Sequence, residues 1–246
     1  MVSQIRFILI KTTHPGNIGA AARALKTMGQ DSMYLVAPQC DPFCDEALAR
    51  AKGGLNLLQN AVVTDTLAQA LGDCHLVIGT ASEQRHFDIP LVSPRQWLDN
   101  LDSLTTSSHK IAILFGPESH GLSNYELQQC HYHWQIPTAH EYGSLNLASA
   151  VQIVAYEWLQ AENTSDITSN NHVTGEQHLL TWQARQKGYE QIEAWLKTHP
   201  FYTRQPTTFK QRLQTIFNRA LISQNDMNFI MGLARALREQ GEANVN

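Results

Sequence analysis

The sequence predicts an α/β fold in which a parallel sheet carries helices on both faces, followed by a small helical extension. Three observations predict this class. The first 160 residues alternate short apolar runs with helix-like stretches; the first run, Ile5–Ile10, is nearly all apolar; and the 246-residue chain is 43% hydrophobic but only 16% charged. Parallel strands are buried on both faces and form continuous apolar runs, and this composition excludes a disordered chain.

The expected elements follow one another in a regular order. After strand Ile5–Ile10, apolar residues recur every three or four positions over Asn17–Met28, which predicts a helix that Gly29 ends. Asp65 is a candidate N-cap for a later helix. The clearest helix is Leu145–Gln160, which has an apolar stripe. The other expected strands are Met33–Ala37, Ala61–Thr64, Cys74–Gly79, Ile111–Phe115 and Tyr132–Ile136. The other expected helices are Pro42–Lys52, Asp65–Leu71, Pro94–Leu101 and Asn124–Cys130.

The chain divides into three parts. Residues 1–161 form the expected α/β domain, residues 162–175 are a polar stretch typical of a linker, and residues 176–246 form a helical extension. The helices expected there are Glu176–Leu196, Thr208–Leu221 and Asp226–Glu239. No run of 18 apolar residues and no signal peptide is evident, and the 4 cysteines do not suggest a disulfide framework. A cytoplasmic protein is expected.

The two ends of the chain differ in charge. Residues 1–175 hold 9 Lys+Arg and 16 Asp+Glu, whereas residues 176–246 hold 9 and 6, and no acid lies between Glu193 and Asp226. Such asymmetry indicates either a polyanion partner for the C-terminal end or a solvated helical face. The basic residues in the acid-free stretch are Lys197, Arg204, Lys210, Arg212 and Arg219.

The sequence gives little support to several familiar phosphate-, dinucleotide- and metal-binding motifs. Leu122 stands where a phosphate-binding loop needs lysine, and no G-x-G-x-x-G follows the first strand. Cys40 and Cys44 lack a second ligand pair nearby. His131 and His133 share one face of a strand, where hydrogen-bonded or surface histidines are more common than metal ligands. No metal is expected.

Three loops after predicted strands carry the candidate chemistry, because ligands of such folds bind beyond the carboxyl ends of the strands. In Thr12–Arg23, Asn17 suits a helix cap, and Arg23 lies among small residues where a phosphate or carboxylate can approach. In Phe115–Ser123, Glu118 either is exposed or ties two loops together. Pro137–Asn146 places Gly143 and Ser144 before a helix, where Ser144 either caps the helix or offers free N–H groups to a ligand.

Together, the three loops resemble the motifs of the SPOUT superfamily of methyltransferases. The motifs are Asn17-Ile-Gly-Ala-Ala-Ala-Arg23, Phe115-Gly-Pro-Glu-Ser-His-Gly-Leu122 and Ser144-Leu-Asn-Leu-Ala148. Their order and spacing fit, and the chain is most similar to the TrmJ-type tRNA 2′-O-methyltransferases. The telling stretches are ARALKTMG (22–29), LSNYELQQCHYH (122–133) and SLNLASAVQIVAYE (144–157). The resemblance is strong over about residues 4–160 and weaker from 176 onward.

The resemblance implies a trefoil-knotted fold, a homodimer with composite active sites, and S-adenosylmethionine as cofactor. It implies methylation of the ribose 2′-OH of a pyrimidine nucleotide in the tRNA anticodon loop, of the position 32 type. Arg23 would be the catalytic residue, and Asn17, Ser144 and Asn146 would shape the site. The implied cofactor-binding residues are Thr80, Ala81, Ser82, Gly116, Glu118, Gly121, Ile136, Gly143, Ser144 and Leu145.

Some residues depart from the family pattern. Pro117 and either Ser119 or His120 stand where relatives often carry arginines, and Gly143 replaces a common serine. The substrate is therefore less firmly indicated than methyl transfer. An rRNA 2′-O-methyltransferase and a non-catalytic RNA-binding factor are the alternatives, and the motif residues argue against the second. A substrate RNA favours the basic C-terminal extension as its binding site, because phosphate contacts need a basic footprint.

Overall fold

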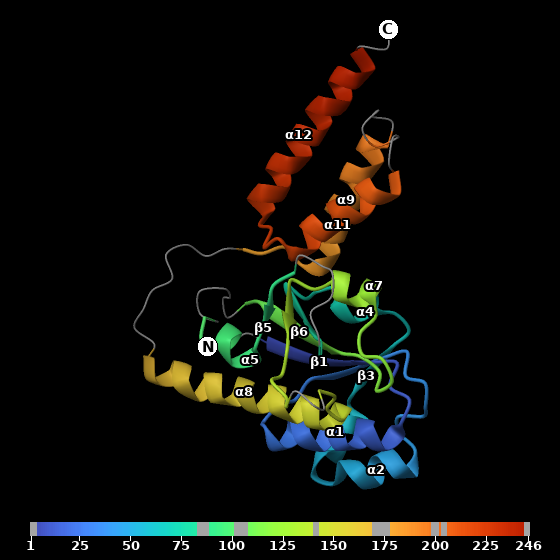
Figure 1. Ribbon diagram of the computed structural model, residues 1–246, viewed down its shortest axis with the longest axis vertical. Helices are drawn as coiled ribbons and strands as arrows, with labels where there is room; N and C mark the ends of the chain where they lie inside the picture. The colour runs from blue at the N-terminus through green and yellow to red at the C-terminus, as the bar shows by residue number, and fades with distance from the viewer. Residues whose placement is uncertain are drawn as a thin grey trace.

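The computed structural model describes residues 4–82, 89–100, 108–139, 143–168, 178–197, 202 and 206–243. Within these ranges, seven strands form one sheet in the order β3-β2-β1-β6-β4-β7-β5, and every recorded pair is parallel (Figure 1). The predicted fold class is confirmed. The strands are β1 (Gln4–Ile10), β2 (Met33–Val36), β3 (Val62–Thr64), β4 (Leu76–Thr80), β5 (Leu91–Val92), β6 (Lys110–Phe115) and β7 (Tyr132–Trp134).

Helices cover both faces of the sheet, as β1 shows. Phe7 and Leu9 belong to one buried cluster, while Ile8 and Ile10 belong to another on the opposite face. The first face carries α1 (Pro15–Thr27), α2 (Asp45–Ala51), η1 (Lys52–Gly54), α3 (Leu55–Gln59), α5 (Pro94–Leu98) and α8 (Leu147–Thr168). The second face carries α4 (Leu67–Leu71) and α7 (Asn124–Gln128).

Two predicted helix caps are wrong. α1 begins at Pro15, before Asn17, because His14 Nδ1 accepts a hydrogen bond from the Gly16 backbone N–H at 3.1 Å. Thr66, and not Asp65, caps α4, where the Thr66 and Gln69 side chains form a reciprocal capping box. In both cases the true cap is a neighbouring residue with a suitable acceptor.

Two short elements were not expected from the sequence. Besides the 3₁₀ turn η1, α3 spans five residues and β5 spans two, and neither is long enough to show a hydrophobic period. The helix predicted at Pro42 begins only at Asp45. The other predicted elements are present with ends shifted by a few residues.

α8 is longer than predicted. It continues to Thr168, so the expectation of an unstructured linker from residue 162 is wrong for its first seven residues. Residues 169–175 of that linker lie outside the described part. The division into domains stays a prediction.

In its described residues, the C-terminal extension contains the helices α9 (Trp182–Leu196), α11 (Pro206–Arg219) and α12 (Gln224–Ala243). Figure 1 shows them extending away from the sheet on the side of α4 and α7. They share a core that includes Tyr189, Phe217 and Met227. No helix among the described residues is long and apolar enough to cross a membrane.

The extension is docked on the sheet domain by buried contacts. Trp182 packs into the second core cluster, and its backbone N–H donates to Cys74 O at 2.6 Å. Arg185 on α9 is buried against His131, and burial lowers the pKa of this guanidinium to about 10. Asn218 Nδ2 on α11 donates to Gln128 O on α7 at 2.7 Å. The two parts therefore share an interface with buried polar pairs.

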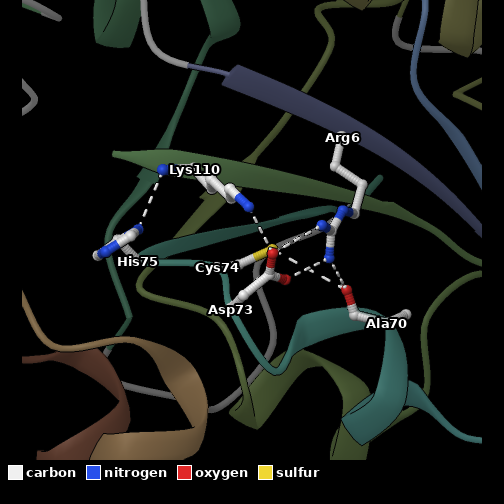
Figure 2. A network of polar contacts seen from close by, with 6 residues as sticks. All are labelled: Arg6, Ala70, Asp73, Cys74, His75 and Lys110. Carbon is white, nitrogen blue, oxygen red and sulfur yellow. Dashed lines mark hydrogen bonds and ion pairs between the residues drawn. The ribbon is translucent and has the colours of Figure 1, made fainter. Parts of the chain in front are cut away.

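A polar network joins the beginnings of β1, β4 and β6 (Figure 2). Arg6 contacts Asp73 Oδ1 at 2.8 Å and also bonds Ala70 O, and Lys110 Nζ lies 2.7 Å from Asp73 Oδ2. The Lys110 backbone N–H donates to His75 Nδ1 at 3.0 Å. Partial burial opposes ionisation of Asp73, but the two cations outweigh it and lower its pKa to about 2.

Candidate active site

A cavity of about 280 Å³ opens at the carboxyl ends of β4, β6 and β7. Thr80 ends β4, Phe115 ends β6 and Trp134 ends β7, and all three line this cavity. The motif loops Phe115–Ser123 and Pro137–Asn146 line it, as the strand-end rule predicts, whereas no residue of Thr12–Arg23 does. All ten predicted cofactor-binding residues line it: Thr80, Ala81, Ser82, Gly116, Glu118, Gly121, Ile136, Gly143, Ser144 and Leu145.

Two glycines allow the middle loop to fold back on itself. A Cβ on Gly116 would lie 2.2 Å from Gly121 C, so only glycine fits there. Gly121 has φ of 65°, in the left-handed region that favours glycine. The glycines thus shape the cavity wall.

A chain of hydrogen bonds joins the three motif loops. Asn17 Nδ2 donates to Glu118 Oε1 at 2.7 Å, and Asn146 Nδ2 donates to Asn17 Oδ1 at 3.1 Å. Thr13 donates to Glu118 Oε2 twice, from its backbone N–H at 3.2 Å and from its hydroxyl at 3.0 Å. Glu118 therefore ties two loops together, and Asn17 connects it to the third.

The Glu118 carboxylate is stabilised in its charged form. Partial burial favours the neutral acid, but the hydrogen bonds from Asn17 and Thr13 outweigh this effect and lower the pKa of Glu118. At neutral pH the carboxylate is an acceptor only, so it fixes the direction of each bond that it receives.

The cavity suits a ligand held by backbone groups. Within the described residues, no acceptor is recorded for the backbone N–H groups of Gly143, Ser144 and Leu145, which line the cavity. The Trp134 indole N–H, in the cavity wall, is buried and likewise has no recorded acceptor there. Leu122 and Leu127 supply an apolar wall. Apolar walls with a few directed donors are typical of cofactor pockets.

The structure does not bring Arg23 to the cavity of its own chain. Arg23 is exposed on α1, and its guanidinium makes no recorded hydrogen bond or ion pair within the described ranges. Ser144 lines the cavity, whereas Asn146 lies beside it and accepts from the Ala148 N–H with its Oδ1 at 3.0 Å. Asn146 therefore caps the start of α8, a role that Ser144 does not take.

The predicted RNA-binding residues have different surroundings. Lys197, Arg212 and Arg219 are exposed. Lys210 Nζ lies 3.4 Å from Glu193 Oε1, so part of its charge is compensated within the extension. Arg204 lies outside the described residues.

The paired histidines His131 and His133 are part of the hydrogen-bonded core. His131 Nδ1 accepts from the Val77 N–H at 3.0 Å, and His133 Nε2 lies 3.1 Å from Leu127 O, so both buried rings are hydrogen-bonded to backbone. No group of three metal-ligating side chains was found among the described residues.

Thr13 and Trp134 are site residues that the sequence did not single out. Trp134 lies inside the predicted strand Tyr132–Ile136, and it ends the observed strand β7, so the strand-end rule pointed two residues too far along the chain. Thr13 carried no signal of its own, since its partner Glu118 is 105 residues away.

The sequence profile of the SpoU rRNA methylase family matches residues 4–156, which include every motif loop described above. The chain belongs to the SpoU methylase family. This family is the SPOUT group, whose fold contains a trefoil knot, so the predicted family and fold are confirmed. SpoU methylases bind S-adenosylmethionine, and the cavity described above fits such a cofactor.

Relatives of this SpoU methylase match it over nearly their whole length. It is 38% identical to the tRNA (cytidine/uridine-2′-O-)-methyltransferase TrmJ of Sodalis glossinidius, over 96% of this chain and 92% of that protein. It is also 38% identical to the tRNA (cytidine/uridine/adenosine-2′-O-)-methyltransferase TrmJ of Pseudomonas aeruginosa, over 95% and 93%. The crystal structure of TrmJ from Z. mobilis superposes with a TM-score of 0.79 at 28% identity, covering 96% of this chain and 99% of that one.

Proposed function

We propose that this SpoU methylase transfers a methyl group from S-adenosylmethionine to the ribose 2′-OH of a pyrimidine at position 32 of the tRNA anticodon loop. The observation that carries the proposal is the Asn146–Asn17–Glu118 chain beside a cavity with free backbone N–H groups. The near full-length similarity to tRNA 2′-O-methyltransferases supports tRNA over rRNA as the substrate. Such a substrate places the protein in the cytoplasm.

When bound, S-adenosylmethionine supplies an electrophilic methyl group on a positively charged sulfur. The accepting hydroxyl loses its proton, so the site must align this hydroxyl and stabilise the negative charge that develops on its oxygen. Ser144 and Asn146 are placed to orient the ribose. Arg23 binds a neighbouring phosphate and stabilises the developing charge, because a guanidinium stays protonated and is a poor base.

The proposal includes a second copy of the chain. α1 and α8 pack together, and their outer surface has a shallow hollow that includes Met28, Ile153 and the exposed Tyr156. A partly apolar hollow between two long helices suits the same helices of another copy in a two-fold dimer. Arg23 lies on α1, so this dimer would carry it toward the partner and explain its absence from its own cavity.

The basic face of α11 is the proposed tRNA-binding surface. Arg212 and Arg219 are exposed, and the acid-free stretch surrounds them. Deleting the whole extension would not test this role cleanly, because Trp182 belongs to the core of the sheet domain. Single charge substitutions on α11 avoid this problem.

Incubation with tritiated S-adenosylmethionine and, in parallel reactions, unmodified tRNA transcripts or rRNA tests the function. Label in the ribose of tRNA supports it. Label in rRNA alone would identify an rRNA enzyme. RNA binding without label, together with no cofactor binding by calorimetry, would identify a non-catalytic factor.

A further inference from the structure

Tyr125 is an exposed aromatic residue on α7. Its side chain is 60% exposed, more than any other large hydrophobic residue described in the sheet domain. No ring contact or hydrogen bond of its side chain is recorded among the described residues. A large, unengaged aromatic ring on a folded domain suits contact with another molecule.

α7 connects the cavity to the C-terminal extension. It is capped by Ser123, directly after Gly121 and Leu122, which line the cavity, and Leu127 lines the cavity from within the helix. At its other end, Gln128 O accepts from Asn218 of α11. Tyr125 therefore sits on a five-residue helix that has the cavity at one end and the basic helix at the other.

Two cations lie near α7, the helix that carries Tyr125. Lys11 Nζ is 3.5 Å from Glu126 Oε1 on α7, and the Lys11 side chain is still 53% exposed. Arg219, exposed on α11, directly follows Asn218. An exposed aromatic ring near cations matches a nucleic acid strand, whose bases stack on rings while its phosphates contact the charges.

We propose that Tyr125 stacks against an unpaired base of the tRNA anticodon loop while the target ribose is at the cavity. The inference rests on the proposed function, because that function brings single-stranded RNA to this end of the sheet. RNA is favoured over a protein as the partner of Tyr125, because the substrate RNA must approach the cavity and a protein partner would not need to. Tyr125 is thus a positioning residue that sets which loop nucleotide reaches the cofactor.

The test compares Tyr125→Ala, Tyr125→Leu and Tyr125→Phe in the full-length protein. The ligand is a tRNA transcript, and its Kd is measured over a range of salt concentrations. Loss of the ring in the Ala and Leu variants should raise the Kd about 5- to 100-fold, and Phe should restore it, because stacking needs the ring and not the hydroxyl. The slope of log Kd against log salt should not change, since no phosphate contact is removed.

Cofactor binding by calorimetry and the thermal unfolding midpoint serve as controls and should match the wild type in all three variants. Equal tRNA affinity for Tyr125→Ala and the wild type, or no rescue by Phe, would overturn the inference and leave the proposed function standing. Wild-type protein that binds tRNA through Tyr125 but labels no ribose would contradict the proposed function and the positioning role, and would support only the stacking of Tyr125 on the RNA. Wild-type protein that binds no tRNA would overturn the inference.

Discussion

Asn146 Nδ2 donates a hydrogen bond to Asn17 Oδ1 at 3.1 Å, although the two residues are 129 positions apart. At each end of this chain of hydrogen bonds, one group can act only as a donor or only as an acceptor. Glu118 can only accept from Asn17 Nδ2, and the Ala148 backbone N–H can only donate to Asn146 Oδ1. Both amide groups are therefore locked in one orientation, and the three motif loops are held as a unit.

Asn17→Asp tests this locked chain. The substitution removes the donor to Glu118 and puts two carboxylates side by side, so kcat/KM for tRNA methylation should fall by about 5- to 100-fold. The matched control is the double variant Asn17→Asp/Glu118→Gln, in which the glutamine amide can donate to the new carboxylate. Recovery of part of the lost activity is expected, and a double variant that is worse than either single one would show that the pair does not act as described.

Arg23→Ala separates chemistry from cofactor binding. Arg23 lies away from the cavity of its own chain, so the Kd for S-adenosylmethionine should stay unchanged while turnover falls by about 100-fold or more. Calorimetry and single-turnover methyl transfer measure the two quantities. Arg23→Lys keeps the charge without the forked geometry and should recover only part of the rate. Full activity in Arg23→Ala would remove this residue from the mechanism.

The dimer proposal predicts an effect of one substitution on α8. Ile153→Arg places a charge in the hollow between α1 and α8, so the protein should elute as a monomer in light-scattering chromatography. If Arg23 acts in the partner's site, methylation should be lost together with the dimer. Gln160→Arg, an exposed change farther along α8, is the control and should leave the dimer intact. A wild type that is monomeric at all concentrations would contradict the proposed dimer.

The proposed binding of tRNA by α11 predicts a change in the salt dependence of the Kd for tRNA. Arg212→Ala on α11 should weaken tRNA binding and reduce the slope of log Kd against log salt by about 1, as expected for one lost phosphate contact. Arg50→Ala, an exposed cation on α2, is the matched control. If both variants keep the wild-type slope, the charge asymmetry of the chain is a solvated surface.

Asp73 predicts a pH-dependent contribution to stability. Its pKa is about 2 in the folded protein against a usual 3.8, so its contribution is complete above about pH 5 and is lost as the pH falls toward 2. The side chain is half exposed, and solvent screening reduces the expected contribution to about 1 kcal/mol. In urea unfolding, Asp73→Asn should be less stable than the wild type at pH 7, and this difference should shrink by pH 3. A constant difference would exclude the ion pairs as its cause.

The sequence predicted the position of the cavity well because that position follows from local patterns. Thr80, Gly116 and Ile136 follow apolar strands, and parallel strands bring such residues to one edge of a sheet. The family motifs then selected residues within those loops.

Contacts between distant segments could not be predicted. Asn17 has the residue type and position of a helix cap, and only the folded chain shows that His14 takes the cap while Asn17 bonds Glu118. Likewise, no periodic pattern in the sequence predicts that Trp182 packs in the sheet core or that Arg185 contacts His131. These contacts depend on which faces meet after folding, and helix propensity does not carry that information.

The central claim is methylation of one ribose in the tRNA anticodon loop. Nucleotide-resolved mapping of 2′-O-methyl groups, on tRNA incubated with S-adenosylmethionine and with or without the protein, tests it most directly. We expect a new 2′-O-methyl group at a pyrimidine in position 32, absent without the protein and absent with Arg23→Ala. A methyl group found only elsewhere, such as position 34 or rRNA, or none at all, would contradict it.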